Sequence, residues 1–284
     1  MPIKISELFY SVQGEGRYMG VPSIFLRTFG CNFQCAGFGM PRGQLSEERL
    51  AVDPKEHTEY GALPLVTTGC DSYASWDPRF KHLSPVKDID TIVDEIMELL
   101  PNKRWEDEHL VITGGEPLLG WQREYPALLG HPKMRDLKEI TFETNGTQEL
   151  TEGLRQYLLE WLQQDDDREI TFSVSAKLPG SGHDFDETIK PQVVEKYASV
   201  GYVYFKFVVA TEEDIKDAEN AVLFFGVGMN PSVFRKAPIY LMPVGGVESV
   251  YTLNAKNVAL AALERGWRYS DRLQVPLFKN AWAT

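Results

Sequence analysis

Most of the chain alternates between short apolar segments that favour β-strands and longer segments with apolar residues at helical spacing. The predicted strand Glu139–Thr144, for example, is followed by a predicted helix at Thr151–Gln163. With an earlier strand at Ser23–Thr28 there are about six β-then-α units, and such alternation requires a parallel sheet with right-handed crossovers. We therefore predict an α/β fold. The remaining predicted strands are Leu110–Thr113, Ile170–Val174, Tyr202–Val209 and Ile239–Met242, and the remaining predicted helices are Asp90–Leu100, Pro126–Leu129, Gln192–Ser199, one beginning at Thr211, and Thr252–Arg265.

Polar and glycine-rich motifs follow the predicted strands at the points where the strands end. They are Cys31–Cys35 (CNFQC), Gly114–Pro117 (GGEP), Glu143–Gly146 (ETNG), Ser175–Lys177 (SAK) and Met242–Gly246 (MPVGG). In curled parallel sheets the active site lies at the carboxyl ends of the strands. We therefore expect these motifs to share one pocket.

The chain has three cysteines, Cys31, Cys35 and Cys70. Thiolates are the usual protein ligands of iron–sulfur clusters. Three thiolates on a four-iron cluster leave one iron open for a small molecule, as a catalytic metal site keeps one position free. Free cysteines are also among the most buried residues, so three core cysteines without chemistry are the alternative. The motifs that follow the later strands favour the cluster.

The composition is that of an ordinary globular protein, with 43% hydrophobic and 25% charged residues. A net charge of −12 predicts no nucleic-acid partner. No apolar run reaches the roughly 18 residues that a membrane span requires. The N-terminal segment lacks the residue order of a signal peptide, and an odd number of cysteines argues against a secreted disulfide framework. We therefore expect a cytoplasmic protein without a membrane partner.

We expect a single domain over residues 1–284, with a long insertion at residues 36–69 between the second and third cysteines. This segment is rich in glycine, proline and charge and shows no long periodicity. Such loops are uncommon and are usually either functional or disordered. Apolar residues such as Tyr60 and Leu63 predict a packed flap over the cluster side. The segment must fold back for Cys70 to reach the other two cysteines.

The pattern CxxxC after one strand and GGEP after another resembles the radical S-adenosylmethionine (SAM) superfamily, in which the third cysteine normally follows much sooner. Further segments narrow the resemblance. FYSVQGEG, PSIFLRTFGCN, Cys70–Ser72, TGGEPLL and ETNGT, in this order between Glu7 and Thr147, are together similar to the 7-carboxy-7-deazaguanine synthases. Weaker matches at SAK, KFVV and YLMP extend to Pro243.

The resemblance implies a partial (β/α)6 barrel of the radical SAM type. It also implies a carbon–nitrogen lyase that converts 6-carboxytetrahydropterin to 7-carboxy-7-deazaguanine, with loss of ammonia, in the biosynthesis of 7-deazapurines such as queuosine. The implied cofactors are a 4Fe–4S cluster, SAM and Mg²⁺, and cleavage of SAM gives a radical that abstracts hydrogen from the pterin. The implied partners are the small-molecule pterin and an electron donor such as flavodoxin or ferredoxin, and a homodimer is a further expectation.

The resemblance assigns cofactor roles to several motif residues. Glycine permits close backbone approach to a ligand, and a carboxylate can accept hydrogen bonds from the SAM ammonium. Read alone, GGEP would also make a simple strand-to-helix turn. Ser72 stands where the family has a threonine as Mg²⁺ ligand. The implied cluster ligands are Cys31, Cys35 and Cys70, and the implied SAM-binding residues are Gly114, Gly115, Glu116, Glu143, Ser175, Ala176, Lys177, Met242, Pro243, Val244 and Gly245.

A second set of residues is implied to bind the pterin. Gln and Glu side chains can read its donor–acceptor edge, and a planar Arg fork suits its carboxylate. Read alone, these residues would form a polar turn and a charge at a strand end. The implied substrate-binding residues are Gln13, Gly14, Glu15, Arg27 and Thr113.

Three other interpretations fit part of the sequence. A glycyl-radical activating enzyme of the same superfamily would not need the QGEG segment. A non-catalytic protein with a structural zinc would need a fourth ligand, such as His57 or His82. A degenerate family member could bind without catalysis, but the intact QGEG, GGEP and ETNGT segments argue against it.

Overall fold

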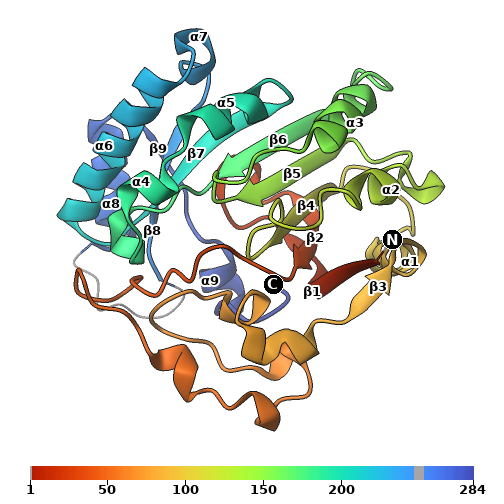
Figure 1. The fold of residues 1–284 in the computed structure, drawn as a ribbon, viewed down its shortest axis with the longest axis horizontal. Coiled ribbons are helices and arrows are strands. Elements are labelled where there is room, and N and C mark those ends of the chain that lie inside the picture. Colours follow the sequence, from red (N-terminus) through yellow and green to blue (C-terminus); the bar gives the residue numbers. More distant parts are fainter. Residues whose placement is uncertain (1, 246–252) are drawn as a thin grey trace.

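The computed structural model describes residues 2–245 and 253–284, and these residues form a nine-stranded sheet with helices on its outer face (Figure 1). The strand order is β3-β1-β2-β4-β5-β6-β7-β8-β9, and every neighbouring pair from β2 to β9 is parallel. The predicted α/β fold is therefore confirmed. The strands are β1 (Pro2–Val12), β2 (Pro22–Thr28), β3 (Val86–Asp88), β4 (His109–Gly114), β5 (Glu139–Thr144), β6 (Glu169–Val174), β7 (Tyr202–Val209), β8 (Ile239–Pro243) and β9 (Arg268–Tyr269).

The helices begin where the sequence supplies capping side chains. Thr211 accepts a hydrogen bond from the N–H of Asp214, whose carboxylate in turn accepts from the N–H of Thr211, so the predicted helix start is confirmed. The predicted start at Thr252 lies outside the described residues, and within them Asn254 caps the last long helix. The helices are α1 (Ile89–Leu99), α2 (Tyr125–Leu129), α3 (Glu152–Leu162), α4 (Phe185–Thr188), α5 (Pro191–Ala198), α6 (Glu212–Gly228), α7 (Pro231–Phe234), α8 (Ala255–Glu264) and α9 (Gln274–Phe278).

The sequence analysis did not predict β1, β3 or β9. β1 runs antiparallel to both β2 and β3, and its pairing with β2 shifts register between Ile5 and Glu7. Such a shift interrupts the alternation of side chains that identifies a half-buried strand. β9 has only two residues, Arg268 and Tyr269. A segment of that length has no periodicity to detect.

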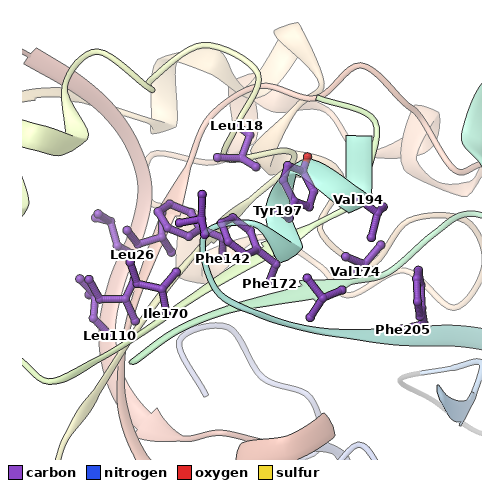
Figure 2. Packing of buried hydrophobic residues seen from close by; sticks show 14 of the residues in the cluster. Leu26, Leu110, Leu118, Phe142, Ile170, Phe172, Val174, Val194, Tyr197 and Phe205 are labelled. Carbon is purple, nitrogen blue, oxygen red and sulfur yellow. The ribbon is translucent and has the colours of Figure 1, made fainter. Parts of the chain in front are cut away.

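The main hydrophobic core lies between the outer face of the sheet and the helices (Figure 2). The rings of Phe142 and Phe172 stack with centroids 5.5 Å apart, and Tyr197 of α5 stacks on Phe172 at 4.7 Å. In β7, Phe205 and Phe207 belong to this core, so the residue between them, Lys206, points to the opposite, inner face. The inner face carries the polar side chains of the site.

Residues 36–69 pack against the protein through short 3₁₀ turns rather than a long helix (Figure 1). Tyr60, Leu63 and Val66 are buried in a second, smaller core, which also contains the buried ring of Trp76. The side chain of Trp282, near the end of the chain, packs on this core. Within the described residues, no helix has the length and apolar character needed to cross a bilayer.

Candidate functional site

The motifs that follow the strands surround one cavity of about 260 Å³ on the inner face of the sheet. Its walls come from β1, β2 and the carboxyl ends of the parallel strands, and from residues 65–72 and the end of the chain. The predicted shared pocket is therefore present. The residues with proposed roles that line it are Gln13, Gly14, Glu15, Arg27, Cys31, Cys35, Cys70, Ser72, Thr113, Gly114, Gly115, Glu143, Ser175, Lys177, Met242 and Gly245.

The three cysteines are free thiols that face this cavity. Cys31 and Cys35 lie in the loop after β2, where Cys35 adopts a φ of +48°, uncommon for a residue other than glycine. The imidazole of His183 fixes that conformation, because its Nε2 accepts the N–H of Cys35 at 3.1 Å. Burial raises the pKa of Cys31 to about 12 and also raises the pKa values of the other two thiols.

The long gap before Cys70 is closed by backbone hydrogen bonds between the two ends of the intervening segment. The N–H of Gly69 donates to the carbonyl of Phe38 at 2.7 Å, and the N–H of Ser46 donates to the carbonyl of Ala36 at 2.7 Å. These contacts bring Cys70 beside the Cys31–Cys35 loop, and Glu48 in the middle of the segment also accepts the N–H groups of Thr67 and Thr68, just before Cys70. The stretched spacing is thus compatible with a shared three-cysteine site.

The donor chemistry of the cysteines suits an iron–sulfur cluster. Cys31, Cys35 and Cys70 all line the cavity, and thiolates are the usual protein ligands of such clusters. Within the described residues, no group of three His, Cys, Asp or Glu side chains close enough to hold one metal ion is present.

The QGEG turn places a buried carboxylate among cationic side chains. Lys206 pairs with Oε2 of Glu15, while Nε of Arg272 and the amide of Gln274 donate to its Oε1 at 3.2 Å and 2.9 Å. Burial alone would raise the pKa of Glu15, but Lys206 and Arg272 hold it at about 2. Gln13 supports the turn, because its side-chain oxygen accepts the N–H of Glu15 at 3.0 Å.

A second charged group lies between β2 and the segment after Cys70. Nε of Arg27 donates to Glu7 at 2.8 Å, and one terminal nitrogen donates to the hydroxyl of Ser72 at 3.3 Å. That hydroxyl lies 3.3 Å from the carboxylate of Asp71, which is paired with Arg272. Burial would raise the pKa of Asp71, but the Arg272 guanidinium lowers it. Because Arg272 contacts both Glu15 and Asp71, it links the two charged groups into one network.

The GGEP turn packs tightly against the cysteine loop. Gly114 has a φ of +149°, and a β-carbon at Gly115 would come within 2.7 Å of the Cys31 β-carbon, so both positions favour glycine. Glu116 is fully buried and does not line the cavity. Its carboxylate accepts hydrogen bonds from Asn145 N–H at 2.7 Å and Thr144 Oγ1 at 2.9 Å, which join GGEP to the ETNG turn. Burial raises the pKa of Glu116 to about 7.

The remaining predicted SAM residues are divided between the cavity wall and the layer behind it. Glu143 accepts from Gln13 and from Thr113, both at 3.2 Å, and so connects the two predicted ligand sets. Lys177 contacts the Ser175 hydroxyl at 3.1 Å within the wall. Besides Glu116, three predicted SAM-binding residues lie outside the lining, namely Ala176, Pro243 and Val244.

Sequence reasoning missed several residues of the charged network, namely Glu7, Asp71, Lys206, Arg272 and Gln274. Lys206 carried a usable signal, because a lysine inside an apolar strand requires a partner. Arg272 and Gln274 lie near the end of the chain and had no motif around them. They reach the site because the N–H of Leu273 bonds the carbonyl of Gly14 at 2.9 Å.

Several known proteins are similar to this chain over nearly its full length. No family model matches the chain. The chain is similar to 7-carboxy-7-deazaguanine synthase of Halobacterium salinarum, with 26% identity over 98% of this chain and 91% of the relative. It is equally similar to the enzyme of the same name from Pyrobaculum aerophilum, with 26% identity over 98% and 96%. Among solved structures, QueE from Escherichia coli has a similar fold, with a TM-score of 0.54 and 19% identity over 96% of this chain and 95% of that one.

Proposed function

We propose that the chain is a member of the 7-carboxy-7-deazaguanine synthase family of radical SAM enzymes, to whose members it is similar over nearly its full length, and that it converts 6-carboxytetrahydropterin to 7-carboxy-7-deazaguanine with loss of ammonia. One observation carries the proposal: the cysteine loop, the displaced Cys70 and the Gln13–Glu15 turn meet at one cavity. A glycyl-radical activating enzyme would have no use for the buried Glu15 network. A structural zinc would need a fourth protein ligand beside the three cysteines.

The cysteines and glycine turns would hold the cofactors. Thiolates of Cys31, Cys35 and Cys70 would bind the 4Fe–4S cluster, which together with SAM supplies a hydrogen-abstracting radical when bound. The absence of side chains at Gly114 and Gly115 leaves the backbone accessible beside the cysteine loop.

The charged network would bind and orient the pterin. Glu15 stays ionised at neutral pH because Lys206 and Arg272 neutralise it, so its carboxylate is an acceptor for N–H groups of a pterin ring. Arg27 would clamp the substrate carboxylate with its planar fork. Its Nε is already fixed by Glu7, so the guanidinium has little freedom to reorient when the substrate binds.

Mg²⁺ would bind at Ser72, together with water and substrate oxygens. Mg²⁺ prefers oxygen ligands and usually keeps several waters. The hydroxyl of Ser72 and the neighbouring carboxylate of Asp71 provide two such oxygens, 3.3 Å apart, at the cavity wall. The donor chemistry therefore suits the ion, and Asp71 adds an oxygen that the sequence did not suggest.

The proposal extends to the setting in which the enzyme works. We place it in the cytoplasm, where reducing conditions keep three free thiols available for iron. An external one-electron donor, such as flavodoxin or ferredoxin, would reduce the cluster.

A homodimer would cover apolar side chains that α6 and α8 expose, including Leu223, Val227 and Leu263. These two helices are joined through the 2.6 Å contact of Arg265 with Glu219.

The decisive experiment is anaerobic turnover after cluster reconstitution, with SAM, a reductant and 6-carboxytetrahydropterin, and with mass spectrometry of the products. We expect 7-carboxy-7-deazaguanine in the parent protein and none in the Cys70→Ala variant. A reconstituted protein that binds iron and cleaves SAM but leaves the pterin unchanged would contradict the substrate assignment. A colourless protein that retains zinc would contradict the enzyme class.

A further inference from the structure

Trp76 is a buried residue of the cavity wall to which the proposed reaction assigns no role. It follows Cys70 in a tight turn, in which the N–H of Tyr73 bonds the Cys70 carbonyl and the N–H of Trp76 bonds the Tyr73 carbonyl, both at 3.2 Å. Both residues line the cavity, and Cys70 packs against the second core, which contains the Trp76 ring. Only 8% of Trp76 is exposed to solvent.

The indole N–H of Trp76 is available for a new hydrogen bond. Among the described residues it has no acceptor at full hydrogen-bonding geometry. A buried donor without an acceptor is costly, so its retention calls for an explanation. The Cys70 sulfur and this unpartnered donor belong to residues that line the same cavity. An acceptor that occupies the cavity wall beside Cys70 would satisfy the N–H.

Residues 36–69 place a cation on the face of the same indole ring. The guanidinium carbon of Arg49 lies 4.8 Å from the ring centroid of Trp76. Asp77 and Gln34 hold this guanidinium, with contacts of 2.5 Å and 3.1 Å. A cation over an indole face attracts its π electrons, which makes the ring N–H a stronger donor. The segment between Cys35 and Cys70 therefore reaches the cysteine site through Trp76.

We propose that Trp76 donates its indole N–H to the Cys70 sulfur when the cluster is bound, and that Arg49 orients and polarises the ring. Hydrogen bonds to the sulfurs and nearby charge set the potential of an iron–sulfur cluster. Reduction adds negative charge that the sulfurs share, so a donor and a cation both favour the reduced state. Trp76 and Arg49 are positioning residues that raise the reduction potential. This inference rests on the proposed function, because it requires a cluster.

The first test compares Trp76→Phe with the parent protein in a redox titration of the reconstituted cluster, followed by electron paramagnetic resonance. We expect up to tenfold less reduced cluster at a fixed ambient potential, which is a shift of about 59 mV to lower potential for one electron. Trp105→Phe is the matched control. Trp105 is also buried with an unpartnered indole N–H, but it lies outside the cavity lining. The cluster in Trp105→Phe should therefore have the reduction potential of the parent.

The second test distinguishes the effect of the Arg49 cation over the indole ring from the effect of its ion pair with Asp77. Arg49→Gln should lower the potential in the same direction by a smaller amount. Arg79→Gln should not, because Arg79 also binds Asp77 but lies over the ring of Phe80, 5.1 Å from its centroid. In addition, the reduced parent should show coupling to an exchangeable proton that Trp76→Phe lacks.

The outcomes distinguish the inference from the proposed function. A Trp76→Phe protein that binds the cluster at the parent potential would overturn the role of Trp76. If Trp76→Phe does not bind a cluster, the measurement is repeated with a tryptophan isostere at position 76 in which sulfur replaces the indole N–H. An unchanged cluster potential in that protein would also overturn the role of Trp76. A parent protein that binds no cluster would overturn the proposed function, and the role of Trp76 with it.

Discussion

The cavity has a substrate end and a cluster end, and they differ in how many of their polar groups have partners within the protein. At the substrate end, carboxylates and cations are already paired, as in the contacts of Glu15 with Lys206 and Arg272. At the cluster end, desolvation raises the pKa values of the three thiols, and the nearby cation Lys177 offsets this only in part. We define the substrate end by Glu7, Glu15, Arg27, Asp71, Lys206 and Arg272, and the cluster end by Cys31, Cys35 and Cys70.

This difference implies two modes of ligand binding. The substrate end is preorganised, because its charged side chains need no reorientation when a ligand arrives. The cluster end is organised by its backbone, while its thiols must lose protons before they can bind iron. Mutations at the cluster end should therefore affect cofactor retention first, whereas mutations at the substrate end should affect the stability of the apo-protein or the affinity for substrate.

The largest effect is expected at the cluster end. Cys70→Ala removes one of three thiolates, and we expect the variant to lose the cluster and all SAM cleavage. Iron content and visible absorbance after anaerobic reconstitution measure the first loss, and 5′-deoxyadenosine formation measures the second. Thermal unfolding of the apo-variant is the control and should match that of the apo-parent. Normal SAM cleavage by Cys70→Ala would remove this residue from the ligand set.

At the substrate end, Lys206→Met should destabilise the apo-protein by about 3 kcal/mol, because it removes one partner from a buried ion pair. Arg272 still contacts Glu15, which keeps the loss at the lower end of the usual range. Urea unfolding of the apo-protein measures the change. Lys133→Met is the matched control, since it breaks the exposed pair with Asp94 and should have little measurable effect. Equal effects of the two variants would refute the idea of a preorganised substrate end.

The sequence predicted the regular part of the fold well, because the parallel strands are buried and have clear apolar patterns. The predicted strands Glu139–Thr144 and Tyr202–Val209 have the observed bounds. β1 was missed because a register shift interrupts its alternation. Residues 36–69 have no periodicity, and their position depends on hydrogen bonds between distant backbone groups, such as Gly69 to Phe38.

The candidate site could be predicted where it follows a motif and not where it depends on tertiary contacts. The cysteines, Gln13–Glu15 and Arg27 were identified from the sequence, and all line the cavity. The partners of Glu15 were missed, since Arg272 is brought to it only by the folding of the chain end over Gly14. Glu116 was identified, but it lies behind the cavity, where it joins two turns. A single sequence does not distinguish a residue that lines the cavity from one that lies behind it.

A third prediction concerns acid stability. The folded pKa of Glu15 is about 2, below its ordinary value of 4.5, so the folded protein binds this proton less readily than the unfolded chain. The stabilising contribution of Glu15 is therefore complete above pH 4.5 and is lost as the pH falls toward 2. Glu15→Gln should show a shallower loss of unfolding free energy over this range. Parallel pH profiles of parent and variant would contradict the assigned pairing.

A smaller effect is expected for Arg27→Lys, which keeps the charge but loses the planar fork. We expect pterin binding to weaken by about tenfold, equivalent to about 1.4 kcal/mol, with SAM binding unchanged. Isothermal titration of the reconstituted protein with each ligand measures both. The hydrogen bond from Nε to Glu7 will be altered as well, so Glu7→Gln is the necessary comparison. An unchanged pterin affinity in Arg27→Lys would show that Arg27 is not the carboxylate clamp.

The smallest effect is expected for the Mg²⁺ site, which combines features of both ends. Ser72 lies beside the paired charges, but its hydroxyl would bind an ion only when substrate supplies further oxygens. Ser72→Ala should therefore raise the Mg²⁺ concentration needed for half-maximal turnover by a few fold, because water and Asp71 can replace the hydroxyl. Ser72→Thr should lower that requirement, since the additional methyl group restricts the hydroxyl to fewer rotamers. SAM cleavage without substrate should not respond to Mg²⁺ in any of the three proteins. If Ser72→Ala has the same Mg²⁺ dependence as the parent, Ser72 is not a ligand, and the oxygens of Asp71 become the site to mutate next.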